Sequence, residues 1–222
     1  MTGTGNFIRA FFIILSILIF SCNNTNKQIA EPDNFSPLNT KYAKGFNLFE
    51  KDSLKKMEVY NPWQKAEDAV FQYYLVNKNK KRNFRKNEIN VPVNRVICLS
   101  TTHLGYIEKL GFEEKVVGAS GINYINSEKY KKLVSQNKLA DVGYEQSLDY
   151  ELIISLKPDV VFAYSVGSEN TGFIEKFAAF NIPVVFIAGY LERHPLGRAE
   201  WIRAFGMFFN AYATTDSIFN II

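Results

Sequence analysis

Short, almost wholly apolar runs alternate with stretches of helical periodicity over the second half of the chain. The apolar runs lie at residues 96–99, 116–119, 159–164 and 183–187. Runs of this length are typical of strands that are buried on both faces. The segments between them show the three- to four-residue spacing of helices, so we expect strands and helices to alternate along the chain.

The predicted helices have recognisable ends. Residues 102–110 indicate a short helix that Gly111 closes. A leucine recurs every four residues from 148 to 156, and we expect Ser147 to cap this helix and Pro158 to end it. Alternating strands and helices predict right-handed crossovers and a parallel sheet.

The segments that follow the predicted strands are rich in hydroxyl groups, aromatic rings and glycine. These segments are residues 100–103, 120–124, 164–168 and 188–192. Because ligands of parallel sheets bind beyond the carboxyl ends of the strands, we expect this edge to meet a ligand.

Residues 42–76 have a different pattern, in which short segments with apolar positions are broken at residues 51–53 and 61–62. This pattern predicts two or three antiparallel strands. Residues 77–90 are crowded with lysine and arginine and indicate a solvated loop. Contact of this loop with anionic lipid headgroups is the alternative.

The first residues have the organisation of an export signal. Arg9 precedes an apolar run at residues 10–20, and Ser21 precedes Cys22. The run is shorter than the roughly 20 residues that span a bilayer comfortably. The Ser21–Cys22 junction resembles a bacterial lipobox, in which Cys22 becomes the lipidated mature N-terminus. An uncleaved anchor and an ordinary secretory signal are the alternatives, and the polar residues 22–40 predict a flexible tether.

Composition narrows the class of protein. Hydrophobic residues make up 47% of the 222 residues and aromatic residues 15%, which is enough for a substantial core. The net charge of +4 is too small to indicate nucleic-acid binding, and no nucleic-acid-binding motif is present. Cys98 lies in an apolar run, so we expect a buried side chain and no disulfide.

Motifs for catalysis, metal binding or nucleotide binding are missing from the sequence. No glycine-rich phosphate loop and no His-Glu-x-x-His motif occurs, so neither a cofactor nor a metal is expected. The two histidines, His103 and His194, are interpreted as cleft or surface residues. Ser100 and Ser165 lack the tight glycine frame of a nucleophile elbow, so no catalytic residue is assigned.

Several short motifs occur in an order and spacing that resemble a known family. They include Asp141-Val142-Gly143, Leu156-Lys157-Pro158-Asp159, Asn181-Ile182-Pro183-Val184, and the segments 42–46, 61–64 and 195–202. The chain resembles the ABC-transporter substrate-binding proteins of the helical-backbone class, in the branch with an N-terminal strand extension. Those proteins capture iron–siderophores, haem or vitamin B12. The resemblance covers about residues 42–220.

The resemblance implies two α/β lobes joined by a long helix, with the ligand between them. It also implies docking onto an ABC permease and its ATPase through one acidic residue on each lobe. The matching residue of the first lobe is Glu151, with Asp149 as a rival. The dipole of the helix also favours an exposed acid at this position, without any partner.

The resemblance also implies which residues contact the ligand. The positional matches are Thr101, Thr102, His103, Tyr144, Glu145, Tyr164, Gly167, Tyr190 and Arg198. Aromatic side chains suit broad, flat ligands such as corrins, porphyrins or catecholate chelates. Arg198 would pair with a carboxylate or an anionic chelate.

The expected fold class is α/β, a Rossmann-like lobe with a parallel sheet and an N-terminal antiparallel strand extension. The expected parts are a lipoprotein signal peptide (1–21), a tether (22–40), the strand extension with the basic loop (41–90), the ligand-binding lobe (91–200) and the start of an interlobe helical region (201–222). In the last part, Ala204, Phe205, Phe208 and Phe209 form an apolar helical stripe. We expect residues 214–216 to cap a further helix. Because this helix is apolar up to Ile222, we expect the second lobe to be missing through truncation.

The leading hypothesis is therefore a lipid-anchored substrate-binding protein of an ABC importer, located in the cell envelope on the periplasmic side. Its partners would be the permease, the ATPase, a membrane and a siderophore, haem or cobalamin ligand, but no nucleic acid. An exported hydrolase that uses His103 as its base is one alternative. An envelope interaction module that presents the N-terminal strands is another.

Overall fold

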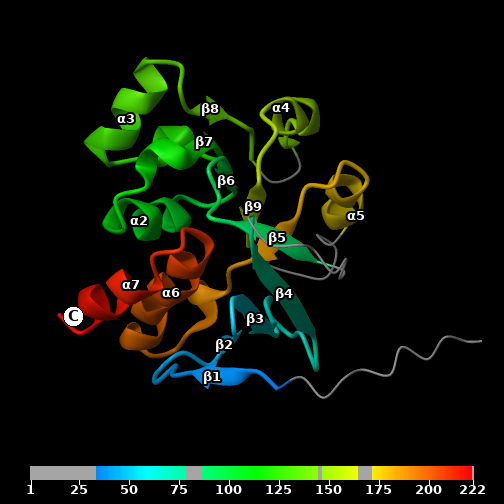
Figure 1. Ribbon diagram of the computed structural model, residues 1–222. Helices are drawn as coiled ribbons and strands as arrows, with labels where there is room; N and C mark the ends of the chain where they lie inside the picture. Colours follow the sequence, from blue (N-terminus) through cyan, green and yellow to red (C-terminus); the bar gives the residue numbers. More distant parts are fainter. Residues whose placement is uncertain (1–33, 79–86, 145–146, 165–171, 222) are drawn as a thin grey trace, which may run out of the picture. The chain divides into compact units, whose positions relative to one another are not determined.

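The computed structural model describes residues 34–78, 87–144, 147–164 and 172–221. These residues form two five-stranded sheets with helices around the second one (Figure 1). The predicted α/β class, a parallel-sheet lobe with an antiparallel strand extension, is confirmed.

The second sheet, here called the parallel sheet, has the strand order β10-β9-β6-β7-β8. Its strands are β6 (Val96–Cys98), β7 (Val116–Ala119), β8 (Ala140–Asp141), β9 (Val160–Ala163) and β10 (Val184–Phe186). All neighbouring strands are parallel. Every residue of β6, β7, β9 and β10 is buried, which is why these strands are apolar without alternation.

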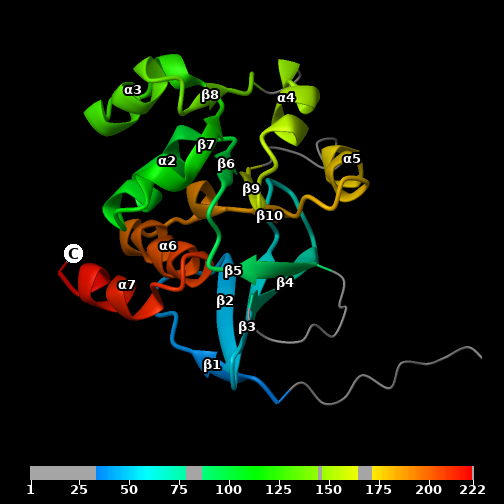
Figure 2. The same cartoon turned by 45° about the horizontal axis from the view of Figure 1, so that its top comes forward.

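Helices cover both faces of the parallel sheet. α2 (Thr101–Lys109) and α3 (Glu128–Ser135) lie on one side, and α4 (Tyr150–Ser155) and α5 (Gly172–Ala178) lie on the other (Figures 1 and 2). This arrangement follows from right-handed crossovers that start at the central strand β6 and wind outward in both directions.

The first sheet, here called the N-terminal sheet, has the order β1-β2-β3-β4-β5. Its strands are β1 (Ser36–Leu38), β2 (Phe46–Lys51), β3 (Leu54–Tyr60), β4 (Val70–Asn77) and β5 (Glu88–Val91). Neighbours are antiparallel except β4 and β5, which are parallel. Phe46 and Leu48 are buried while Asn47 between them is exposed, so one face of this sheet joins the core.

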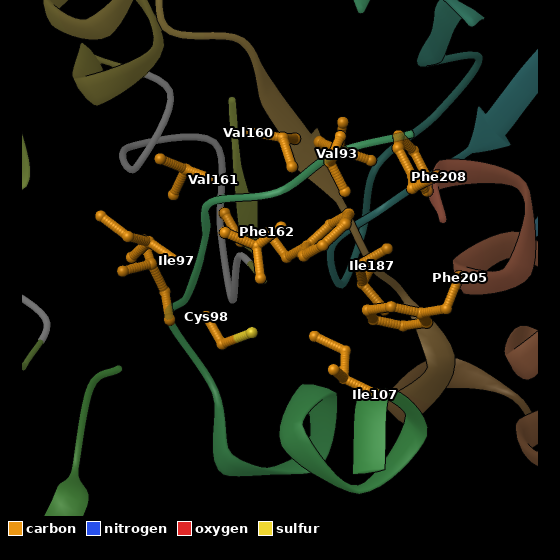
Figure 3. Close-up of a cluster of buried hydrophobic side chains, with 14 of the residues drawn as sticks. Val93, Ile97, Cys98, Ile107, Val160, Val161, Phe162, Ile187, Phe205 and Phe208 are labelled. Atoms are coloured by element: carbon orange, nitrogen blue, oxygen red, sulfur yellow. The ribbon is translucent and has the colours of Figure 1, made fainter. Parts of the chain in front are cut away.

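A single hydrophobic core connects the two sheets with α6 (Pro195–Phe208). Figure 3 shows Cys98 of β6 and Phe162 of β9 pointing toward Ile107 of α2 and Phe205 of α6. The rings of Phe162 and Phe205 are 4.8 Å apart between centroids. The Cys98 thiol is free and buried, as predicted, and burial raises its pKa, so it stays protonated.

The helix boundaries differ from the sequence prediction in two places. Asp149, not Ser147, caps α4, because its carboxylate accepts the backbone N–H of Leu152 at 2.9 Å. α7 (Tyr212–Phe219) begins before residues 214–216, so these residues lie within the helix and do not cap it. Ser147 and Asp149 are both good cap residues, so the sequence alone does not decide between them for α4. Ala211 occupies the N-cap position of α7, and no side chain caps that helix.

Four elements were not predicted from the sequence. β1 occupies Ser36–Leu38, inside the segment that was expected to be a tether, and pairs with β2. β5 begins at Glu88, inside the expected basic loop. α3 and β8 were not predicted either. β1 and β8 have only three and two residues, too few to show a period, and they form because a neighbouring strand pairs with them.

Two buried carboxylates hold the chain segment that leads into the N-terminal sheet. Glu200 of α6 accepts the backbone N–H groups of Lys41, Tyr42 and Ala43 at 2.8, 2.6 and 2.8 Å. Glu192 accepts those of Lys44 and Gly45 at 3.0 and 2.8 Å. We call residues 41–45 the N-terminal loop and these contacts the carboxylate clamp.

Glycines make the close approach of the clamp feasible. A Cβ on Gly45 would lie 3.1 Å from a Glu192 carboxylate oxygen, and a Cβ on Gly197 would lie 3.1 Å from both Glu192 and the Tyr42 carbonyl oxygen. The Trp201 indole N–H also donates to Glu192 at 3.2 Å. Glu192 is 5% exposed and Glu200 is 0% exposed. Because neither carboxylate is hydrated, these hydrogen bonds replace the ones that each would make to water.

Replacing Glu200 by Gln should destabilise the protein by about 2–3 kcal/mol, because the amide NH₂ faces backbone donors and leaves at least one buried N–H without an acceptor. Urea unfolding followed by circular dichroism measures the change. The exposed Glu114 offers a matched control, and Glu114→Gln should change the free energy of unfolding by less than about 0.5 kcal/mol. Equal effects of the two substitutions would contradict the role given to the clamp.

Candidate ligand-binding site

A cavity of about 230 Å³ opens at the carboxyl edge of the parallel sheet. Its lining residues come from the segments after β6, β9 and β10, and they are Ser100, Thr102, His103, Tyr106, Tyr164, Ile187, Gly189 and Tyr190. The cavity lies where a doubly wound parallel sheet places its ligands, since the strand ends meet at this edge.

The start of α2 forms one wall of the cavity. Ser100 caps the helix, and its hydroxyl accepts the backbone N–H of Thr102 at 3.3 Å. His103 and Tyr106 are three residues apart on the helix, so they face the same side. The Tyr106 hydroxyl donates to the Arg198 carbonyl oxygen at 2.7 Å, and its ring stacks on Phe205 with centroids 5.0 Å apart.

His103 is neutral over the whole physiological range. It is only 2% exposed, and burial lowers its pKa to about 3, although a hydrogen bond to the backbone of Phe162 acts in the opposite direction. Its Nδ1 has no hydrogen-bond partner within the described residues. Burial also raises the pKa of Tyr106 to about 12, so both side chains present uncharged groups.

Three tyrosines form the outer part of the site. Tyr164 and Tyr190 meet edge to face with centroids 6.4 Å apart, and the Tyr164 hydroxyl lies 3.5 Å from that of Tyr144. Tyr144 is 50% exposed and Tyr190 is 38% exposed. Tyr124, in the turn after β7, is 76% exposed at the same edge of the sheet. Tyr144, Tyr164 and Tyr190 offer ring surface at the cavity, and we call these three residues the tyrosine rim.

The structure brings together part of the predicted ligand-contact set. Thr102, His103, Tyr164 and Tyr190 line the cavity, and Tyr144 contacts Tyr164. As ligand contacts they stay a prediction. Glu145, Gly167 and the predicted lipidation residue Cys22 lie outside the described residues.

Thr101 and Arg198 do not line the cavity. Thr101 starts α2 one position before the residue that faces the site. Arg198 is exposed on α6, and its guanidinium Nε donates to the Glu192 carbonyl oxygen at 2.8 Å. Consequently, no lining side chain in the described part of the chain carries a formal charge at neutral pH.

Sequence reasoning missed Tyr106, which contributes its ring and hydroxyl to the wall. The signal that could have identified it is its spacing of three residues from His103 on a helix that starts at the strand end. Ser100, Ile187 and Gly189 lie at predicted strand ends but were not assigned as contacts.

The two acidic residues at the start of α4 have different environments. Asp149 is occupied as the helix cap, whereas Glu151 is exposed in the first turn. Of the two, Glu151 is the one whose carboxylate makes no cap contact.

The described residues contain no cluster of three or more His, Cys, Asp or Glu side chains that could hold a metal ion. In the same ranges, no helix combines the length and the apolar character needed to cross a membrane.

Residues 96–220, more than half of the chain, match the family model for periplasmic binding proteins. The chain therefore belongs to the periplasmic binding protein family. The α/β lobe with its parallel sheet is consistent with this family.

Among curated proteins, an uncharacterised lipoprotein of Methanocaldococcus jannaschii is 33% identical over 193 residues, covering 77% of this chain and 46% of that protein. A second lipoprotein of the same organism is 31% identical over 138 residues, covering 59% of this chain and 34% of that protein. The chain thus spans less than half the length of the curated relatives it matches.

Solved structures show a weaker likeness. A periplasmic haem-binding protein of Vibrio cholerae is 17% identical with a TM-score of 0.46, covering 57% of this chain and 45% of that chain. A periplasmic binding protein of Veillonella parvula is 13% identical with a TM-score of 0.48, covering 73% of this chain and 48% of that chain. Since both TM-scores are below 0.5, no functional conclusion follows from these two likenesses.

The buried His103 should make the protein less stable in mild acid. The unfolded chain binds a proton near the ordinary pKa of 6.5, whereas the folded chain does so only near 3. As the pH falls below about 6.5, the free energy of unfolding should therefore decrease by up to ~1.4 kcal/mol per pH unit because of His103. Urea unfolding at about pH 7, 6 and 5 should show a steeper loss for the wild type than for His103→Gln. Parallel pH profiles would contradict the neutral, buried state of His103.

Proposed function

We propose that this chain belongs to the ligand-binding lipoprotein of an ABC importer, which captures an iron chelate, haem or cobalamin and delivers it to a permease and its ATPase. The observation that carries the proposal is the uncharged cavity with its tyrosine rim at the carboxyl edge of the parallel sheet. Membership of the periplasmic binding protein family supports it.

The dimensions of the site favour a ligand larger than the cavity. Small-molecule pockets measure about 300–1,000 Å³, so a cavity of about 230 Å³ holds one edge or side arm of such a ligand. The rest of a broad ring system would lie against the tyrosine rim, where aromatic rings offer large contact areas. Corrins, porphyrins and compact iron chelates have this shape.

The chemistry of the cavity supports binding without turnover. The hydrolase alternative needs His103 as a base, but a side chain with a pKa of about 3 is a weak proton acceptor. The Ser100 hydroxyl is engaged in capping α2. Neither residue therefore has the environment of an activated catalytic pair.

The location we propose is the cell envelope on the periplasmic side, with Cys22 as the lipidated residue. The lipobox-like junction and the two relatives named as lipoproteins support this part of the proposal. Glu151 is proposed as the carboxylate that docks onto the permease, because it is exposed while Asp149 is used as a cap.

Truncating Tyr164 to alanine should weaken ligand binding about tenfold, because a ring in the cavity wall contributes about 1.4 kcal/mol or more. Isothermal titration calorimetry with haemin, ferrichrome and cyanocobalamin measures the affinities. Phe180→Ala removes a ring that is 55% exposed and does not line the cavity, so it should leave the affinities unchanged. Ligand binding that Tyr164→Ala does not weaken, or turnover of any of the ligands, would contradict the proposal.

Reversing the charge at Glu151 should reduce ligand uptake by membranes that contain the permease without changing ligand affinity. Uptake of labelled ligand into proteoliposomes and calorimetry separate these two effects. Asp149→Ala should instead lower stability by about 1 kcal/mol through loss of the cap. Glu114→Lys is the control, because it reverses the charge of an exposed acid on another element. If Glu114→Lys reduced uptake as much as the charge reversal at Glu151, the docking role of Glu151 would be contradicted.

A further inference from the structure

The cavity has two walls that come from different parts of the chain. The α2 wall contributes His103 and Tyr106, and the segment that follows β10 contributes Ile187, Gly189 and Tyr190. We call this second segment the β10 wall. The separation of the two walls determines which shapes the cavity accepts, because a pocket encloses a ligand from more than one side.

The Tyr106 hydroxyl lies at the junction of the two walls. It donates to the Arg198 carbonyl oxygen at 2.7 Å, and the Tyr106 ring stacks on Phe205. A Cβ on Gly189 would lie 3.3 Å from this hydroxyl and 3.3 Å from the Trp201 ring. The β10 wall therefore passes close to Tyr106 at a position that has little room for a side chain.

The Arg198 side chain holds the end of the β10 wall. Its Nε donates to the Glu192 carbonyl oxygen at 2.8 Å. Glu192 directly follows the turn Gly189–Leu191, and its own backbone N–H donates to the Gly189 carbonyl oxygen at 3.2 Å. Arg198 therefore binds the β10 wall through its side chain and the α2 wall through its carbonyl oxygen, although it does not itself line the cavity.

The first turn of the 14-residue helix α6 gives Arg198 a fixed position. His194 Nδ1 caps this helix and accepts the Leu196 backbone N–H at 3.1 Å. A Cβ on Gly197 would lie only 3.1 Å from the Tyr42 carbonyl oxygen, so the helix packs closely on the N-terminal loop. Because the helix is held in this way, hydrogen bonds to Arg198 fix the position of the two walls.

We propose, resting on the proposed function, that Arg198 is a positioning residue of the ligand site, which sets the separation of the α2 wall and the β10 wall and does not bind the ligand through its charge. The two roles differ in their dependence on the ligand. A wall that is fixed before binding lowers the cost of binding for every ligand. An arginine that contacts the ligand favours anionic ligands.

Arg198→Met tests the proposal on the full chain, because it removes the guanidinium and keeps a side chain of similar bulk. It should weaken binding about five- to tenfold, through the loss of preorganisation. The factor should be the same, within about twofold, for haemin with its anionic propionates and for the uncharged cyanocobalamin and ferrichrome. Isothermal titration calorimetry at about 50 and 300 mM sodium chloride should give equal factors, because no charge contact is lost.

Arg198→Lys provides a second variant in case Arg198→Met does not fold. Lysine keeps the positive charge but has a methylene group where Nε donates to Glu192. If Arg198 acts through this hydrogen bond, the lysine variant should lose most of the same affinity. If Arg198 acts through its charge, the lysine variant should keep its affinity for haemin.

A double-mutant cycle tests whether Arg198 and Tyr106 act on the same separation. Tyr106→Phe removes the hydroxyl and keeps the ring, and it should weaken binding about threefold or more. Once one wall is released, releasing the other should cost less. The loss in the double variant should therefore be smaller than the product of the two single losses, by at least about threefold.

Two controls separate positioning from a loss of charge or of stability. Arg193→Met makes the same substitution at an exposed arginine that does not line the cavity. The Asp159 carboxylate, at the amino edge of the parallel sheet, accepts the backbone N–H groups of Asn94 and Arg95 at 2.6 and 3.1 Å. Asp159→Ala should therefore lower the free energy of unfolding. Both variants should keep the affinities of the wild type, with folding verified by circular dichroism.

The outcomes separate this inference from the proposed function. A loss in Arg198→Met that affects haemin alone, or that disappears at the higher salt concentration, overturns the inference and leaves the proposed function intact. Wild-type affinities in Arg198→Met, or single losses that simply multiply in the double variant, overturn it as well. If haemin, ferrichrome and cyanocobalamin all fail to bind to the wild type, the proposed function fails, and this inference fails with it.

Discussion

The arrangement of the molecule depends on the carboxylate clamp, in which Glu192 and Glu200 accept five consecutive backbone N–H groups of the N-terminal loop. The contacts join positions that are about 150 residues apart in sequence, so they determine where the N-terminal sheet meets α6. Charged acceptors strengthen each bond, and the buried position makes every loss costly. Phe46, which follows the loop, can then pack its ring on Trp201 with centroids 4.5 Å apart.

The clamp also reaches the cavity through α6. Glu192 uses its carboxylate for the clamp and its carbonyl oxygen for the Arg198 guanidinium, and the Arg198 carbonyl oxygen in turn accepts the Tyr106 hydroxyl proton. A side chain at Gly189 would lie 3.3 Å from both Trp201 and the Tyr106 hydroxyl. The α2 wall of the cavity is therefore supported by the same residues that hold the N-terminal loop. A change in Glu192 would affect both.

The parallel sheet could be predicted from the sequence because strands buried on both faces leave unbroken apolar runs, as in residues 96–99 and 159–164. The same pattern predicted that the ligand site lies at the carboxyl edge of this sheet, where the cavity is found. The contact residues were harder to predict from the sequence. Thr101 and Thr102 are adjacent, and only the rotational position of each residue on α2 decides which one faces the cavity. The clamp could not be predicted, because every residue except proline has a backbone N–H group and the sequence does not show which of them a distant carboxylate binds.

The α2 wall of the cavity and the tyrosine rim differ in how much conformational freedom they lose when a ligand binds. The Tyr106 hydroxyl is hydrogen-bonded, and His103 and Tyr106 both contact the Phe205 ring, whereas Tyr144 is half exposed. Ordering an exposed side chain costs about 0.5–1.5 kcal/mol, and a preorganised one adds little to that cost. The rigid α2 wall is therefore the part of the site that discriminates between similar ligands. The rings of the tyrosine rim can instead adjust to ligands that differ in shape outside the cavity.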